Sequence, residues 1–297
     1  MLYLDLIKMR KLFITTSVVA LLFSCNNKEA HKNNVSETKK ETIVSNEKIV
    51  SLNGAITEVL ADLGYENNLV GVDVTSTYPT SVKEKAKDLG HVRSLSIESL
   101  LALKPTKVFA TDKDITPEQI SQLENAGISV EIIKQDYSID GTKNLIKSVA
   151  TTLNNTNYET LDNKIDTDLK KLKLIQTKPK VLFIYARGAG NLMVAGKNTP
   201  MEKIISIAGG ENAITEFEDF KPLTPEAVVK SNPDYILMFD SGLKSIGGID
   251  GVLKIEGIAP TNAGKNKKII AMDGQLLSGF GPRVGEAAVQ LNQLLQK

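Results

Sequence analysis

The sequence is poor in the residues that most often carry catalysis or metal binding. It contains one cysteine, two histidines and no tryptophan in 297 residues. A single cysteine excludes an internal disulfide framework and a cluster of thiolate metal ligands. There is no Ser-His-Asp arrangement, no glycine-rich phosphate loop and no H-E-x-x-H helix, which argues against common hydrolases and nucleotide enzymes. The net charge is +1, so no basic excess favours a nucleic acid partner.

Residues 1–25 have the pattern of a secretory signal peptide. The basic stretch Lys8–Lys11 precedes an apolar run, Leu12–Phe23, and Cys25 follows shortly after. At about 12 residues, this run is too short to span the ~30 Å hydrocarbon core of a bilayer. The position of the lone cysteine resembles a bacterial lipobox, which implies that Cys25 is acylated and anchors the chain to a membrane. The alternative is a plain signal peptide with an incidental cysteine.

Residues 26–46 are polar and charged and contain few large apolar residues. A segment of this composition cannot bury a core, so we expect a flexible tether. Residues 47–297 are enough for two lobes of roughly 100–130 residues each. No second long apolar run follows the signal, so the lipid at Cys25 is the membrane attachment that the sequence predicts.

Short β-branched runs alternate with amphipathic segments along the rest of the chain, which is typical of α/β lobes with mostly parallel sheets. The expected strands are Lys48–Leu52, Leu69–Asp73, Lys107–Thr111, Val130–Lys134, Lys180–Tyr185, Leu192–Ala195, Tyr235–Phe239 and Lys268–Met272. The expected helices include Ala55–Leu63, Ile97–Leu103, Pro117–Asn125, Met201–Ala208 and Pro225–Ser231.

Residues 143–177 differ from the rest because they contain no glycine or proline and carry apolar residues at helical spacing. The pattern predicts one long helix, kinked if at all near Asn154–Asn157. This helix would join an N-terminal lobe, residues 47–142, to a C-terminal lobe, residues 178–297. The expected fold is therefore α/β, with two Rossmann-like lobes joined by one long helix and a ligand cleft between them. The alternative is two ordinary surface helices of one larger domain.

An internal repeat supports two related lobes. The segment SIESLLALKPTKV, residues 96–108, parallels TPEAVVKSNPDYI, residues 224–236. Each copy has a hydroxyl residue suited to an N-cap, a glutamate two residues later, a short apolar helix and a proline that ends it. The two glutamates, Glu98 and Glu226, either stabilise the positive ends of helix dipoles or form a matched pair of acidic docking points.

Three stretches resemble the helical-backbone class of ABC-transporter substrate-binding proteins, which handle vitamin B12, ferric siderophores and haem: IVSLNGAITEVLADLG, LVGVD and GHVRSLSIESLLALKPTKV. The resemblance runs from about Lys48 to the C-terminus. It implies a periplasmic lipoprotein of a Gram-negative cell envelope that is no enzyme and delivers its ligand to an inner-membrane permease and ATPase complex. In this class one glutamate on each lobe docks onto permease arginines, so the resemblance assigns docking to Glu98 and Glu226.

Three further segments resemble the haem-binding proteins of this class, of the HmuT, ShuT and PhuT type: DVTSTYP, LMVAGKNT and GFGPR. The resemblance implies that haem is the transported ligand, that Tyr78 is the axial ligand of its iron and that Arg283 lies beside Tyr78. The chemistry agrees, because ferric iron suits an anionic oxygen ligand and tyrosinate ligates haem in catalase. A free tyrosine has a pKa near 10, so binding as phenolate at pH 7 needs a nearby cation such as a guanidinium.

A haem site also needs apolar walls, cations for the propionates and a firmly held loop. Gly279 and Gly281 permit close backbone approach, and Pro282 stiffens the turn that leads to the arginine. Each wall or carboxylate candidate has a core or surface role as its alternative. The wall candidates are Phe280, Leu276, Leu277 and Met193, and the carboxylate candidates are Arg187 and Lys197.

One position departs from the family pattern. Some members place a histidine in the loop after the first strand of the C-terminal lobe, where it ligates a second haem. This sequence reads YARGAG there, and Arg187 has no free lone pair with which to bind iron at neutral pH. The histidines present are His31, in the tether, and His91, which we interpret as a loop residue with a sixth iron ligand as the alternative.

Three other functions compete with haem capture for an importer. The first is a ferric siderophore or cobalamin binding protein of the same class. The second is a periplasmic enzyme, which is suggested only by Asp73, Asp112 and Asp240 near predicted strand ends, where α/β folds place active sites. The third is a cell-surface haem scavenger that works without a permease.

Overall fold

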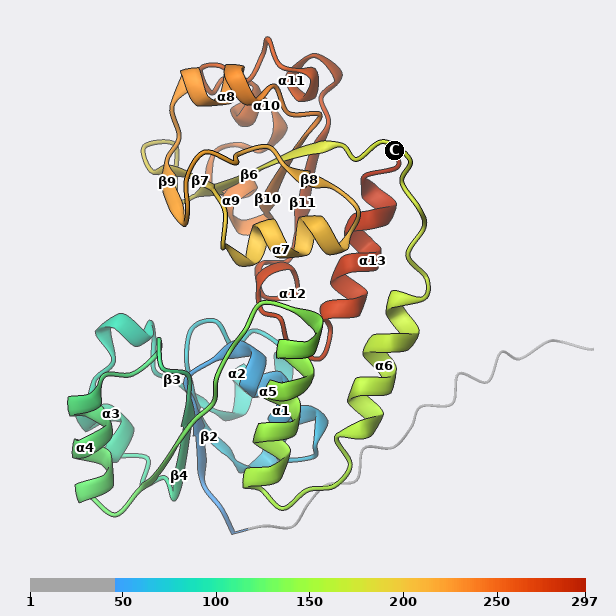
Figure 1. Cartoon of the computed structure of the whole chain (residues 1–297). Helices are drawn as coiled ribbons and strands as arrows, with labels where there is room; N and C mark the ends of the chain where they lie inside the picture. Colours follow the sequence, from blue (N-terminus) through green and yellow to red (C-terminus); the bar gives the residue numbers. More distant parts are fainter. Residues whose placement is uncertain (1–45) are drawn as a thin grey trace, which may run out of the picture. The chain divides into compact units, whose positions relative to one another are not determined.

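The computed structural model describes residues 46–297 (Figure 1). The predicted signal peptide, Cys25 and the tether up to residue 45 lie outside the described residues. Within the described part, no helix combines the length and apolar character needed to cross a bilayer.

The first sheet contains five parallel strands in the order β3-β2-β1-β4-β5. Because parallel strands point the same way, the loops that follow β2, β1, β4 and β5 all emerge at the carboxyl edge of this sheet. The strands are β1 (Ile49–Ser51), β2 (Leu69–Val72), β3 (Lys87–Asp88), β4 (Lys107–Ala110) and β5 (Ser129–Ile132). The connecting helices are α1 (Gly54–Asp62), α2 (Thr80–Lys85), α3 (Ile97–Leu101) and α4 (Pro117–Asn125), with 3-10 turns η1 (Glu66–Asn68) and η2 (Val92–Ser94).

The second sheet is mixed and has the order β11-β10-β6-β7-β9, with β8 also paired to β6. Strands β11, β10 and β6 run parallel, whereas β7 is antiparallel to both of its neighbours. The strands are β6 (Lys180–Ala186), β7 (Leu192–Ala195), β8 (Glu211–Asn212), β9 (Phe220–Pro222), β10 (Tyr235–Phe239) and β11 (Ile269–Met272). The helices of this half are α7 (Pro200–Ile207), α8 (Pro225–Ser231), α9 (Asp240–Ser245), α10 (Gly248–Leu253), α11 (Asn262–Asn266), α12 (Gly274–Ser278) and α13 (Val284–Leu294).

The alternation of strands and helices predicted from the sequence is confirmed. Each predicted strand corresponds to a strand of the structure, and α4, α8, β7 and β10 have the predicted bounds. Most elements that the sequence does not predict are short, because one or two turns of helix or two paired residues give no periodic signal. They include α2, α9, α10, α11, β3, β8 and β9. The exception is α13, which has 11 residues and is not among the predicted helices.

The single long helix predicted over residues 143–177 is wrong. The segment contains two helices, α5 (Ile139–Thr152) and α6 (Glu159–Leu169), and no helix is assigned between Lys170 and Thr177. Asn154 has φ +52, the left-handed conformation that commonly ends a helix, and the Asn155 side chain then accepts the Asn157 N–H. Helix α6 lies beside α13 (Figure 1), so the connection between the halves packs against the C-terminal helix.

The repeat seen in the sequence is a repeat of structure. Ser96 caps α3 by accepting the Ser99 N–H, and Thr224 caps α8 by accepting the Ala227 N–H. Both copies end in a left-handed residue just before the proline: Lys104 with φ +51 and Asn232 with φ +39. A strand follows each copy, β4 in one half and β10 in the other.

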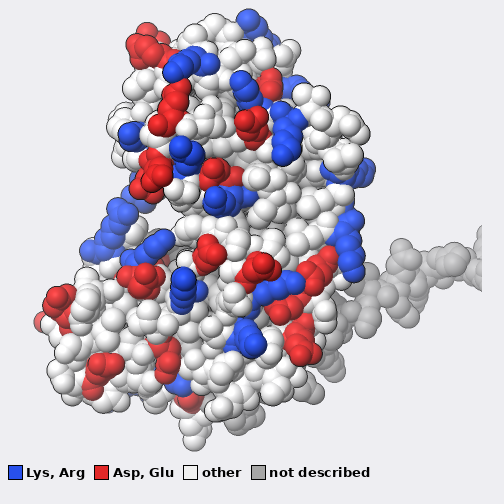
Figure 2. Space-filling model, in the orientation of Figure 1, with Lys and Arg blue, Asp and Glu red and all other residues white. Residues whose placement is uncertain are grey.

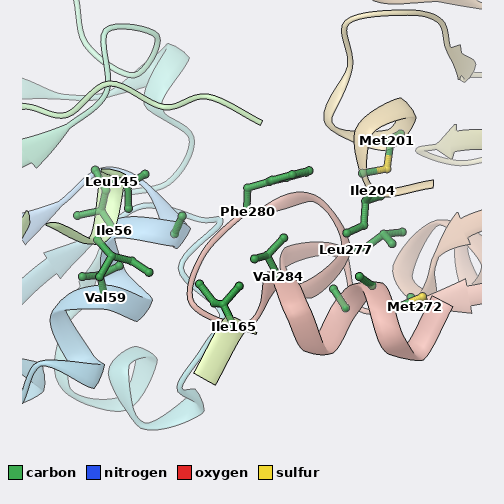
Figure 3. Close-up of a cluster of buried hydrophobic side chains, with 14 of the residues drawn as sticks. Ile56, Val59, Leu145, Ile165, Met201, Ile204, Met272, Leu277, Phe280 and Val284 are labelled. Atoms are coloured by element: carbon green, nitrogen blue, oxygen red, sulfur yellow. The ribbon is translucent and has the colours of Figure 1, made fainter. Parts of the chain in front are cut away.

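One hydrophobic core connects the two halves. It includes residues from α1 and α5 beside the first sheet and from α7 and α12 beside the second sheet. Figure 3 shows Phe280, Val284 and Ile165 between Ile56 and Leu145 on one side and Met201 and Ile204 on the other. These side chains bury their apolar surface together, which stabilises the two halves as one folded body. Smaller clusters lie within each half.

Candidate ligand-binding site

Tyr78 lies in the loop between β2 and α2, at the carboxyl edge of the first sheet, and 41% of it is exposed. Asp73 holds the backbone of this loop, because its carboxylate accepts the Thr75 N–H at 2.9 Å and the Ser76 hydroxyl at 2.7 Å. Val74, in the same loop, is also an exposed apolar residue. Asp73 is therefore a structural residue of the loop that carries Tyr78, with its oxygens already occupied.

Arg283 comes from the distant loop between α12 and α13, and the structure brings it against Tyr78. The guanidinium carbon lies 3.6 Å from the centre of the Tyr78 ring, a close cation–π contact. The Arg283 side chain is only 13% exposed, so its charge acts on the ring with little screening by water. The phenol group of Tyr78 remains at the surface, where a ligand can reach it.

Glu58 on α1 holds Arg283 in this position. The Arg283 Nε donates to Glu58 Oε2 at 3.0 Å and Nη2 donates to Oε1 at 2.5 Å, a bidentate pair. Glu58 is 3% exposed and is not among the site residues that the sequence predicts. A signal exists, because every residue from Gly54 to Ala61 is buried, and an acid in the middle of such a buried stretch needs a buried partner.

Gln275 on α12 joins the two elements that carry Tyr78 and Glu58. Its Oε1 accepts the backbone N–H groups of Thr77, at 2.6 Å, and of Tyr78, at 3.1 Å. Its Nε2 donates to Glu58 Oε1 at 2.7 Å and to the Gly54 carbonyl at 2.8 Å. Gln275 is also absent from the residues predicted from the sequence.

The Gly279–Arg283 loop is docked on the first half of the chain. Gln135 donates to the Gly279 carbonyl, and Thr142 donates to the Phe280 carbonyl. At Gly281 a Cβ atom would lie 3.3 Å from the Ala55 Cα and from Glu58 Oε2, so glycine permits the backbone of this loop to approach α1 closely. These contacts hold the loop, and with it Arg283, against the half of the chain that carries Tyr78.

The expectation that Phe280 lines the ligand pocket is wrong. Phe280 is 2% exposed, and its ring packs edge-on against Tyr137 with the ring centres 5.5 Å apart. Its backbone has φ +50, an unusual value for a bulky residue, which turns the side chain away from the loop surface and into the core. Leu277 is likewise fully buried.

The other predicted residues make no hydrogen bond or ion pair with Tyr78 or Arg283 in the described part of the chain. Arg187 is exposed after β6, and its Nε donates to the Tyr185 hydroxyl at 2.5 Å. Lys197 is exposed beyond β7. His91 caps η2, because its Nδ1 accepts the Arg93 N–H. In residues 46–297, no group of three or more His, Cys, Asp or Glu side chains is arranged to hold a metal ion.

Glu98 and Glu226 are both exposed and both occupy the second position of their helices, α3 and α8. No lysine or arginine of the described residues lies within ion-pair distance of either carboxylate. Figure 2 shows positive and negative side chains interspersed over the face that it draws. On that face there is no broad region of one sign, so any charge-based docking there would depend on particular residues.

A small pocket of about 150 Å³ adjoins the site and is lined from both halves of the chain. This volume is below the roughly 300 Å³ at which pockets for drug-sized ligands begin. The pocket alone therefore does not hold a ligand of that size. The lining residues are Asn53, Gly54, Ala55, Thr75, Gln135, Tyr137, Gln275, Ser278 and Gly279.

Burial controls the protonation of Glu58. Desolvation raises the pKa of Glu58 to about 7 from its ordinary value of 4.5, although the hydrogen bonds and charge of Arg283 oppose the change. Burial lowers the pKa of Arg283, but its hydrogen bonds to Glu58 and the Glu58 charge outweigh this effect and raise it. The negative charges of Asp62 and Asp273 also raise the pKa of Glu58, by less than burial does. Near neutral pH, Glu58 therefore exchanges a proton while the arginine stays charged.

This shift predicts a pH dependence of stability. Between pH 4.5 and about 7, folded Glu58 binds a proton that the unfolded chain has released, so rising pH destabilises the folded state. At 1.36 kcal/mol per pKa unit, the free energy of unfolding should lose about 3 kcal/mol through Glu58 between pH 4 and 8. Urea unfolding at several pH values measures it, with Glu58→Gln as the comparison. The difference in stability between the two proteins should change with pH; a constant difference would contradict the assignment.

Comparison with known proteins places the chain among binding proteins. A family model described as periplasmic binding protein matches residues 49–276. The chain is 29% identical over 252 residues to YvrC, an uncharacterised ABC transporter substrate-binding lipoprotein of Bacillus subtilis, covering 82% of this chain and 78% of that protein. It is 26% identical over 204 residues to a vitamin B12-binding protein of Vibrio campbellii, covering 64% and 70%.

Among solved structures, the chain is similar to the periplasmic haem-binding protein RhuT from Roseiflexus sp. RS-1 in its apo form. The TM-score is 0.81 at 39% sequence identity, covering 84% of this chain and 98% of that chain. The two-lobe α/β fold and the predicted resemblance to ABC-transporter binding proteins are thereby confirmed.

Proposed function

Because the chain belongs to the periplasmic binding protein family, we propose that it is the substrate-binding component of an ABC importer whose ligand is haem. The observation that carries the proposal is the exposed Tyr78 with the Arg283 guanidinium 3.6 Å from its ring centre. Tyrosine ligates ferric haem iron through its phenol oxygen, and the Tyr78 residue that would supply it is exposed to a ligand. The haem-binding function of RhuT supports the same ligand.

The proposal assigns a role to each remaining predicted residue. Tyr78 supplies the axial oxygen and Arg283 stabilises its negative charge, while Val74 offers apolar surface for the flat face of the ligand. Arg187 and Lys197, both exposed, pair with the propionates. Glu98 and Glu226 dock onto the permease of the importer. The chain acts in the periplasm, where a lipid on Cys25 attaches it to a membrane.

Titration with two ligands tests the choice of haem. The chain without residues 1–25 should bind haemin saturably and develop the absorption bands of a ferric tyrosinate complex. Cyanocobalamin should produce no saturable change, because its cobalt does not require a protein phenolate. Saturable binding of cobalamin with none of haemin would reject haem as the ligand in favour of the class represented by the vitamin B12-binding relative.

A further inference from the structure

Gln275 makes more side-chain hydrogen bonds around the site than Tyr78 or Arg283 does. Its carboxamide oxygen accepts three hydrogen bonds, from the Thr77 N–H, the Thr77 hydroxyl and the Tyr78 N–H, at 2.6, 2.7 and 3.1 Å. Its carboxamide nitrogen donates two, to Gly54 and Glu58. All donors lie on one side and all acceptors on the other, so the partners fix the orientation of the amide.

These contacts reach both members of the Tyr78–Arg283 pair. The oxygen of Gln275 fixes the backbone on which Tyr78 is mounted. Its nitrogen shares Glu58 Oε1 with Arg283 Nη2, so the same side chain also fixes the carboxylate that aims the guanidinium. Glu58 is almost fully buried, and in such surroundings each hydrogen bond is worth more than in water.

We propose that Gln275 is a positioning residue of the ligand site, which acts from α12 to hold the Tyr78 loop and, through Glu58, the Arg283 guanidinium in register. This inference takes its ligand, haem, from the proposed function. The hydrogen bonds of Gln275 do not depend on that proposal. The site is thus assembled across the two halves of the chain: the tyrosine belongs to one half and the side chain that fixes it belongs to the other. Movement of α12 away from α1 would release Tyr78 and Glu58 together.

Gln135 provides a matched control. It is also a glutamine that lines the small pocket, and its Nε2 donates to the Gly279 carbonyl at 2.9 Å. It contacts the arginine-bearing loop but makes no hydrogen bond to Thr77, Tyr78 or Glu58 among the described residues. Gln275→Leu and Gln135→Leu therefore remove the same chemical group from one pocket, and only the first change removes support from Tyr78.

Hydrogen exchange and haemin titration of the full chain together test the inference. In Gln275→Leu, the Tyr78 amide should exchange at least about tenfold faster without ligand, because it loses its acceptor. The Thr77 amide keeps the Thr75 carbonyl at 2.8 Å and should change less. Haemin affinity of Gln275→Leu should fall about tenfold or more, and its ferric spectrum should change. Gln135→Leu should leave the exchange of the Tyr78 amide native, because Gln135 contacts only the arginine-bearing loop. Unchanged exchange, or faster exchange with native haemin affinity and spectrum, would overturn the positioning role.

Gln275→Glu keeps the size of the side chain and serves if the leucine variant does not fold. It retains an acceptor for Thr77 and Tyr78. Above the Glu58 pKa of about 7 it places a second carboxylate against the ionised Glu58, so haemin affinity measured there should again fall about tenfold or more. Native affinity in this variant would overturn the role. If the native chain binds no haemin at all, the proposed function fails and the exchange measurement alone decides whether Gln275 holds the loop.

Discussion

Replacing Tyr78 with phenylalanine should lower haemin affinity by about a hundredfold or more, equivalent to about 2.7 kcal/mol, and should abolish the ferric tyrosinate absorption bands. The substitution removes only the phenol oxygen and leaves a ring of the same size under Arg283, so the loop has no reason to rearrange. The loss would therefore report the bond to iron. Absorption and resonance Raman spectra during a haemin titration give both the affinity and the ligand identity.

Tyr235→Phe is a suitable control for this experiment. Tyr235 also lies beside a cation, because Lys268 Nζ is 3.0 Å from its hydroxyl and 4.5 Å from its ring centre, but it belongs to β10 and is buried. Its replacement should leave the haemin spectrum unchanged. Native affinity and a native spectrum in Tyr78→Phe would exclude Tyr78 as the iron ligand.

Reversing the charge of both Glu98 and Glu226 should reduce haem uptake by tenfold or more while haemin binding in solution stays native. Single exposed ion pairs contribute little, but a like charge placed opposite a partner's arginine costs several kcal/mol, and the double change does so on both lobes. Uptake by cells that carry the importer and lack the native binding protein measures the effect, with haemin affinity measured separately.

Glu118→Lys is the matched control for the docking residues. Glu118 is an exposed glutamate at the second position of α4. Thr116 caps α4 as Ser96 and Thr224 cap α3 and α8, but Glu118 lies outside the repeated segments. If first-turn glutamates only stabilise their helices, all three reversals should act alike and modestly. If Glu98 and Glu226 dock, only their reversal should abolish uptake. Native uptake in Glu98→Lys/Glu226→Lys would show that docking uses other residues.

The outline of the site can be predicted from the sequence because two of its functional groups lie in short motifs. Tyr78 and Arg283 stand in segments rich in glycine, proline and hydroxyl residues, which constrain the backbone locally. The residues that hold Tyr78 and Arg283 in place cannot be predicted in this way. Gln275 and Thr77 are 198 residues apart in the chain, and nothing local to either residue indicates that they meet.

Glu58 can be predicted in part. Its neighbours along α1 are buried on every side, so a paired internal acid can be expected, but the identity of the partner depends on how the Gly279–Arg283 loop docks. The same docking explains why Phe280 is a poor prediction. An aromatic residue next to glycines fits a ligand wall equally well, and only its left-handed backbone, φ +50, sends the ring into the core.

The fold follows the sequence closely wherever an element is long enough to show its own period. The break between α5 and α6 falls near Asn154–Asn157, where the predicted helix has its kink. The sequence still favours one helix because the apolar spacing continues across the break: Val149 and Ile165 both enter the shared core. Periodicity reports which face is buried, and two successive helices can bury their faces against the same core. Asn154 is the residue that separates them, and asparagine is tolerated inside a predicted helix at little apparent cost.

The central position of β1 gives the domain a mechanical property. The chain enters the described domain just before Ile49, and β1 is bonded in parallel to β2 on one side and to β4 on the other. Tension applied at this end along the strand would load two ladders in shear, so their hydrogen bonds would have to break together. An edge strand pulled sideways would instead open one bond at a time. A domain tethered at its N-terminal end is therefore held through the strand of the first sheet that is hardest to withdraw.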